Sequence, residues 1–137
     1  MTGSDRSGLR VLEPDACWRH LTSHRPRVCR LAFRQEGRLH LIPAAYALDN
    51  RSIVLCTDPA RLLGRLPPGE PISFEVDAVD DRWEQGWSVL VQGTLAVIDD
   101  AEGLRHARQL PLHPWAPGAD AKYLRIDPER ISGRRIV

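Results

Sequence analysis

Lysine is almost absent from this chain of 137 residues, because Lys122 is the single lysine among 19 basic residues. The 18 acidic residues nearly balance them, and a net charge of +1 gives no reason to expect binding to nucleic acid or to an anionic membrane. No apolar run approaches the roughly 20 residues that span a bilayer. The N-terminal residues also lack the apolar core of a secretory signal, so we expect a cytoplasmic protein.

Cysteine is scarce as well. Cys17, Cys29 and Cys56 are an odd number with no Cys-x-x-Cys pair, so neither a disulfide framework nor a zinc ribbon is expected. Cys17, His20 and His24 recur at helical spacing, but no fourth ligand is evident and we expect no metal site. Cys29 and Cys56 fit buried positions in strands, where cysteine behaves as a small hydrophobic residue.

The most informative stretch that is present covers residues 86–98. Trp87, Val89 and Val91 share one parity there, while polar residues occupy the other, which is the alternation of a half-buried strand. Gly93 permits a bulge or a close approach by another backbone. A strand of about a dozen residues is longer than usual and indicates a curved, barrel-like sheet.

The remaining pattern predicts short elements. Helices are expected over residues 14–23 and 58–66, and from Asp99 or Asp100 to residue 109. The other strands are expected over residues 28–34, 38–48, 52–57, 72–76 and 122–127, with an arginine-rich tail over residues 131–137. Pro43 inside one strand indicates an edge position or a local bend. We expect a mainly β domain over residues 13–137, a six-stranded barrel with short flanking helices, after a flexible tail of residues 1–12.

Several phrases along the chain follow the order and wording of a known family. They are Arg30-Leu31-Ala32-Phe33, Ile42-Pro43-Ala44-Ala45-Tyr46, Leu55-Cys56-Thr57, Ile72-Ser73-Phe74-Glu75-Val76-Asp77, Gly86-Trp87-Ser88-Val89, Pro114-Trp115-Ala116-Pro117-Gly118 and Ile131-Ser132-Gly133-Arg134-Arg135-Ile136. Together they resemble the pyridoxamine 5'-phosphate oxidase-like superfamily, the FMN-binding split β-barrels, in its small actinobacterial-type branch. The resemblance covers residues 14–136.

This resemblance implies a homodimer of split barrels with two equivalent sites at the interface. It implies an oxidoreductase acting on a small molecule, with FMN or the deazaflavin F420 in the dimer cleft. The cofactor itself performs the hydride transfer in such a site, so no acid–base pair is required, and no catalytic residue is assigned. The residues implied to bind the cofactor lie along the ring, at the phosphate and at the closing wall: Pro43, Ala45 and Tyr46; Thr57 and Arg61; Trp87, Ser88 and Trp115.

Two positions depart from the family pattern. Ala45 stands where the family has asparagine, and Cys56 stands where the phosphate-binding arginine is expected. Replacing a guanidinium by a thiol removes a charge-assisted contact worth about 1.5–3 kcal/mol. Arg61 is the candidate to replace the family's lysine, although an apparent deletion of one residue also allows Leu62 at that place. Two functions therefore stay open: a flavin-dependent oxidoreductase, or a flavin-independent protein whose cleft binds another small molecule, as a binding protein or a repurposed biosynthetic enzyme.

Overall fold

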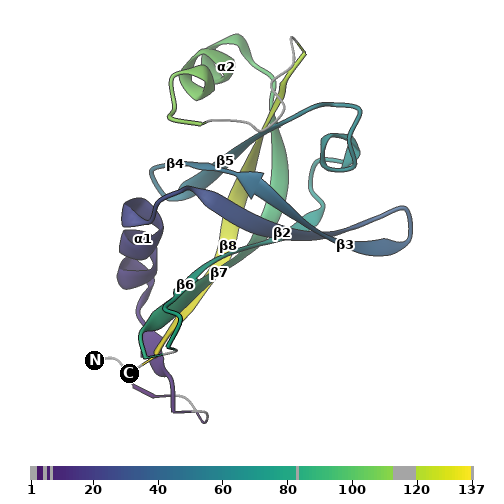
Figure 1. The fold of residues 1–137 in the computed structure, drawn as a ribbon. Coiled ribbons are helices and arrows are strands. Elements are labelled where there is room, and N and C mark those ends of the chain that lie inside the picture. The colour runs from purple at the N-terminus through teal and green to yellow at the C-terminus, as the bar shows by residue number, and fades with distance from the viewer. Residues whose placement is uncertain (1–2, 5, 7, 83, 113–119, 137) are drawn as a thin grey trace.

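The computed structural model describes residues 3–4, 6, 8–82, 84–112 and 120–136. Its strands form one antiparallel sheet in the order β3-β2-β6-β7-β8-β5-β4, and β1 pairs with β8. The strands are β1 Arg10–Leu12, β2 Val28–Gln35, β3 Arg38–Ala45, β4 Ala47–Asp49, β5 Ser52–Thr57, β6 Pro71–Val79, β7 Gly86–Ile98 and β8 Lys122–Ile136. The helices are α1 Pro14–Ser23, α2 Ala101–Arg108 and the short 3-10 turn η1 Leu63–Arg65. Figure 1 shows the sheet curled into a half-barrel, with α1 along one side and α2 beyond the ends of β7 and β8.

The long pair β7–β8 forms the spine of the sheet. Their register shifts between Gln92 and Gly93, so a bulge lies at the glycine where the sequence allowed either a bulge or a close backbone approach. A Cβ atom on Gly93 would meet the carbonyl oxygen of Asp127 at 2.1 Å, so only glycine allows the two backbones to approach this closely. The bulge bends both strands and gives the sheet its curl.

Strand β8 is longer than the sequence predicted, and this corrects the prediction that residues 131–137 form a tail. The strand was expected to stop before Pro128, but it continues to Ile136 and pairs with β7 from Tyr123 to Ile136. Proline is tolerated here because it lies opposite Gly93 at the bulge, where the regular ladder of hydrogen bonds is already interrupted.

Three further expectations differ from the structure. Residues Arg10–Leu12, assigned to the flexible tail, form β1 and pair with β8. The predicted strand over residues 38–48 is divided at Tyr46 into β3 and β4. Together with β1, this division gives eight described strands instead of six. The helix predicted over residues 58–66 is reduced to η1, because residues 59–62 form turns, with the Ala60 amide donating to the Asp58 carboxylate.

The core lies inside the curl of the sheet. It contains one face of each central strand, with residues such as Leu31, Phe74 and Val89 that are almost inaccessible to solvent. Helix α1 closes one side by burying Cys17, Trp18 and Leu21 against this face. Asp100 caps helix α2 by accepting a hydrogen bond from the Gly103 amide at 2.9 Å, which decides between the two capping residues, Asp99 and Asp100, that the sequence allowed. None of the described helices is long and apolar enough to cross a membrane.

The outer face of the sheet carries several exposed hydrophobic side chains. Among the described residues, four large hydrophobic side chains are exposed, and the strand registers place all four on this face: Leu39, Leu41, Val79 and Leu90. The same face carries Arg30, which forms ion pairs with Glu75 at 2.8 Å and Asp77 at 2.6 Å. The registers place Arg34 and Arg130 on this face as well, so exposed hydrophobic and charged side chains alternate across it.

Candidate functional site

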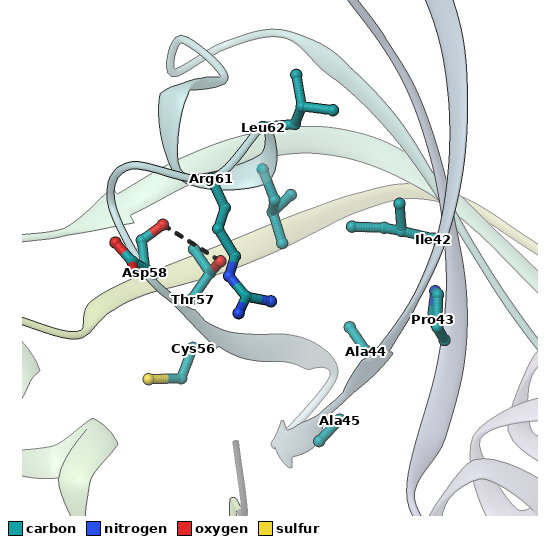
Figure 2. A pocket seen from close by; sticks show the side chains of 10 residues that line it. Ile42, Pro43, Ala44, Ala45, Cys56, Thr57, Asp58, Arg61 and Leu62 are labelled. Carbon is teal, nitrogen blue, oxygen red and sulfur yellow. Dashed lines mark hydrogen bonds between the residues drawn. The ribbon is translucent and has the colours of Figure 1, made fainter. Parts of the chain in front are cut away.

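A pocket of about 460 Å³ lies where the two ends of the curled sheet meet, between the edge strand β3 and strand β5. Its volume is in the range of pockets that hold cofactors and drug-sized molecules. Figure 2 shows ten side chains around it. They come from β3, from the end of β5 and from the segment that follows β5: Ile42, Pro43, Ala44, Ala45, Cys56, Thr57, Asp58, Arg61, Leu62 and Leu63.

The β3 wall of the pocket is apolar. Ile42 and Ala44 pack against the core, and Pro43 and Ala45 have the opposite parity. Pro43 has no amide to donate, which is tolerated because β3 is an edge strand, one of the two alternatives that this proline indicated in the sequence. The small side chains of Ala44 and Ala45 leave room for a flat group to lie along this strand. Ala45 also contributes no hydrogen-bonding side chain, whereas the family pattern has an amide there.

The opposite wall carries the polar groups. Thr57 ends β5, and its hydroxyl donates a hydrogen bond of 3.5 Å to the Asp58 carbonyl oxygen. Figure 2 shows the Arg61 side chain extending into the pocket, and its guanidinium has no hydrogen-bond or ion-pair partner among the described residues. Cys56 is half-buried, and burial raises the pKa of its thiol, so this side chain stays neutral at pH 7. In the described lining, Arg61 and Asp58 are thus the only charged groups.

The segment that carries Arg61 is fixed by contacts with its surroundings. The Asp58 carboxylate accepts a hydrogen bond from the Ala60 amide at 2.9 Å, and the Asp58 carbonyl accepts one from the Arg61 amide at 3.1 Å. Gly64 packs so tightly on this turn that a Cβ atom would lie 2.3 Å from the Asp58 carbonyl oxygen. Lys122 donates to the Gly64 carbonyl from β8. Arg61 therefore projects from a turn that hydrogen bonds and close packing hold in one conformation.

The structure brings together four of the eight residues assigned to the cofactor site from the sequence: Pro43, Ala45, Thr57 and Arg61. Tyr46 instead lies in the core, where its hydroxyl donates to the Leu21 carbonyl at 3.4 Å and its ring meets Phe74 edge-on. Burial raises the pKa of Tyr46 to about 12. The break between β3 and β4 turns this side chain away from the pocket.

Two more of the assigned residues lie outside the pocket, and one lies outside the described residues. Trp87 stacks on His20 with ring centroids 4.5 Å apart, so it packs against α1. Ser88 lies opposite Asp77 of β6 and Arg134 of β8 in the strand register, in the middle of the sheet. Trp115 lies outside the described part of the chain.

Six of the ten lining residues were not assigned to the site from the sequence. Cys56 and Leu62 were considered there without being assigned, and the others are Ile42, Ala44, Asp58 and Leu63. Ile42 has the inward parity of β3, and this alternation was a usable signal. Asp58 and Leu63 belong to the segment predicted as a helix, so their orientation toward the pocket could not be deduced. A better signal was the Asp-Pro pair at residues 58–59, which favours a turn after a strand.

Comparison with known proteins identifies the family. The family model described as pyridoxamine 5'-phosphate oxidase matches residues 13–135. The chain belongs to this family. The resemblance inferred from the sequence is thereby confirmed.

Solved structures of relatives have the same fold. A Corynebacterium glutamicum protein of the same named family has a TM-score of 0.81 at 26% identity, covering 93% of this chain and 97% of that one. An FAD binding protein from Mycobacterium smegmatis has a TM-score of 0.77 at 28% identity, covering 92% and 96%. An FAD-binding protein from Mesorhizobium loti has a TM-score of 0.74 at 26% identity, covering 94% and 99%. These relatives have the split barrel, which confirms the predicted fold class.

Curated relatives match over a shorter region. An uncharacterized protein of Mycobacterium tuberculosis is 38% identical over 69 residues, which are 50% of this chain and 45% of that protein. A second protein from this species is 33% identical over 63 residues, 46% of this chain and 56% of that protein. The chain spans about half the length of these curated relatives.

Proposed function

We propose that the pocket between β3 and β5 binds the ring of a flavin (FMN, FAD or the deazaflavin F420) and that the protein is an oxidoreductase acting on a small molecule. One observation carries this proposal: an apolar strand wall faces an unpaired guanidinium and a hydroxyl across a pocket of about 460 Å³. A flat ring with an anionic tail matches both walls. Relatives at 26–28% identity that are named FAD-binding proteins support the same ligand class.

Each wall has a separate task in this proposal. Pro43, Ala44 and Ala45 would hold the ring against β3, and Thr57 and Arg61 would contact the anionic tail. The lining fits such a group because its apolar and cationic parts lie on opposite sides. A bound flavin supplies the hydride transfer. The chain's own contribution is to bind and orient the ring and to exclude water from it.

We also propose that the protein works as a homodimer through the outer face of its sheet. Leu39 and Leu41 are 76% and 70% exposed, which is costly for large hydrophobic side chains in an isolated protein. Pro43 and Ala45 share their parity on β3, so the pocket opens at the margin of the same face. A second copy that covers this face would also narrow the mouth of the pocket.

A flavin-independent small-molecule protein is the second candidate. The observation that favours it is the small number of hydrogen-bond donors for a phosphate, since the described lining offers one guanidinium and one threonine hydroxyl. Ala45 and Cys56 also replace two polar groups of the family pattern. Such a pocket also suits a smaller apolar molecule with a single negative charge.

Ligand binding by the purified full chain separates the two candidates. The flavin proposal predicts saturable binding of at least one of FMN, FAD and F420, followed by absorbance and calorimetry. Arg61→Ala should weaken binding about tenfold or more, since it removes a charge-assisted contact. Arg38→Ala is the matched control, because Arg38 lies at the exposed tip of the β2–β3 hairpin outside the pocket. Failure of all three ligands to bind at tens of micromolar would exclude the flavin proposal and leave the second candidate.

A further inference from the structure

Charged side chains on the outer face of the sheet are sorted by strand. The register places Glu75 and Asp77 of β6 on this face at one side of β7, and we call them the acidic strip. It places Arg130 and Arg134 of β8 on the same face at the other side of β7, and we call them the basic strip. The exposed Leu90 of β7 lies between the two strips.

We propose that two copies of the chain recognise each other by laying the basic strip of each copy on the acidic strip of the other, about a two-fold axis that runs along β7. This inference rests on the homodimer proposed above and adds the contacts that select the partner. A two-fold interface joins the same surface of both copies, so every contact is made twice. With the axis along β7, each β6 faces the β8 of the other copy, and the two Leu90 side chains meet at the centre.

The strand register sets which charges would meet. Asp77 and Arg134 lie opposite the same residue of β7, so they stand at one level along the strands. The axis therefore brings Asp77 opposite Arg134 of the second copy. Glu75 stands at the level of Leu90, between the levels of Arg130 and Arg134, so an arginine of the second copy approaches it from either side. Acid meets base at matching levels in both halves of the interface.

Within one chain the two strips do not neutralise each other well. Strand β7 separates them, so their backbones lie about 10 Å apart. Arg30 is the only ion-pair partner of Glu75 and Asp77 among the described residues, at 2.8 and 2.6 Å, and both carboxylates share it. Arg130 has no hydrogen-bond or ion-pair partner in the described part of the chain. The acidic strip thus keeps one negative charge in excess, and the basic strip keeps an unpaired guanidinium.

The leucine between the strips makes these charges more effective. An ion pair in water contributes little, but its attraction grows where water is excluded. Two Leu90 side chains in contact would exclude water from the charges on either side of them. Complementary charges also reject wrong partners more strongly than they add affinity. A face that carries both strips at matching levels is complementary to itself, so a second copy fits it.

Complementary charge swaps in the full chain test this pairing. A homodimer of Asp77→Arg would place arginine opposite arginine twice, and a homodimer of Arg134→Asp would place aspartate opposite aspartate twice. The dimer dissociation constant of each variant should therefore rise about 100-fold or more in sedimentation. An equimolar mixture restores both opposite-charge contacts, so it should form heterodimers within about tenfold of the wild-type affinity. Arg105→Asp, on an exposed site of α2, is the control: it should dimerise as the wild type does and should not rescue Asp77→Arg.

The outcomes separate this pairing from the homodimer itself. Wild-type dimerisation of either variant alone, or no heterodimer from two folded variants, would overturn the pairing and leave the homodimer in place. A monomeric wild-type protein would overturn both. Circular dichroism shows whether the variants fold. If one does not, the salt dependence of the wild-type dimer decides: raising sodium chloride from about 50 to about 500 mM should weaken the dimer about tenfold, because salt screens the strips. A dimer affinity that salt leaves unchanged would overturn the pairing.

Discussion

Lys122, the single lysine of the chain, donates a hydrogen bond of 2.8 Å from its Nζ to the carbonyl oxygen of Gly64. This contact joins the first residue of β8 to η1, and η1 closes the segment that projects Arg61 into the pocket. The lysine is only half-buried, so its ammonium group keeps contact with solvent while it holds the segment in place. The position of the pocket's one described cation therefore depends on a residue outside its lining.

Substitution of this lysine tests that dependence. Lys122→Met keeps the length of the side chain and removes the donor, which should lower the free energy of unfolding by about 1–2 kcal/mol. Because the segment then loses a tether, flavin affinity should also fall about threefold to tenfold. Urea unfolding and calorimetry measure the two effects. Loss of stability with full affinity would show that the bond does not position Arg61.

Gly64 is expected to tolerate no side chain. A Cβ atom there would lie 2.3 Å from the Asp58 carbonyl oxygen and 2.7 Å from the Pro59 Cα, so Gly64→Ala must displace the turn. The free energy of unfolding should fall by about 1–3 kcal/mol, as for other overpacked sites. Gly3→Ala is the matched control, since nothing lies within 4 Å of a Cβ atom there. Equal stability of the two variants would contradict this account of the turn.

The sequence predicted the elements whose signals are local. Alternation over residues 86–98 located β7, and Gly93 marked its bulge before any partner strand was known. The extent of β8 was missed because Pro128 ends a strand when read locally. It is accommodated only because Gly93 lies opposite, and this is a contact between residues distant in sequence.

In the pocket, too, some residues could be assigned from the sequence, and others depend on contacts that form only in the folded chain. Pro43 and Thr57 were assigned through the family resemblance, and the curl of the sheet brings them together. Nothing local placed Asp58 at the site, because its role depends on how a turn packs. For Tyr46 the family resemblance was misleading. The family motif predicted that this residue contacts the ligand, whereas the break between β3 and β4 directs its ring into the core.

Cys56→Arg should create a second cation beside Thr57. The half-buried end of β5 gives the new guanidinium access to the pocket, and a charge-assisted contact to phosphate is worth about 1.5–3 kcal/mol. We expect FMN affinity to rise about tenfold or more, measured by calorimetry. Cys56→Ser is the control, because it changes the atom without adding charge. A folded Cys56→Arg protein with wild-type FMN affinity would place the phosphate elsewhere.

Glu75 should make stability depend on pH. Burial raises its pKa from 4.5 to about 7, and the neighbouring Asp77 carboxyl acts in the same direction, against the opposing effect of Arg30. Between these two values the folded chain binds more protons than the unfolded chain, so the free energy of unfolding falls as pH rises through this window. Glu75→Gln removes the titration. Its stability relative to the wild type should therefore increase from pH 5 to pH 8 in urea unfolding at one protein concentration. A constant difference would contradict the raised pKa.

Leu41→Asp should separate the proposed dimer. Leu41 is 70% exposed on the outer face, two residues from Pro43, so a carboxylate there would be buried without a partner if a second copy covers this face. Sedimentation should show a dimer for the wild type and a monomer for Leu41→Asp. Ala101→Asp, on an exposed site of α2, should stay dimeric. Because the pocket opens at the margin of the same face, the monomeric variant should also bind flavin more weakly. A monomeric wild-type protein, or a dimeric Leu41→Asp variant, would show that the exposed leucines serve another purpose.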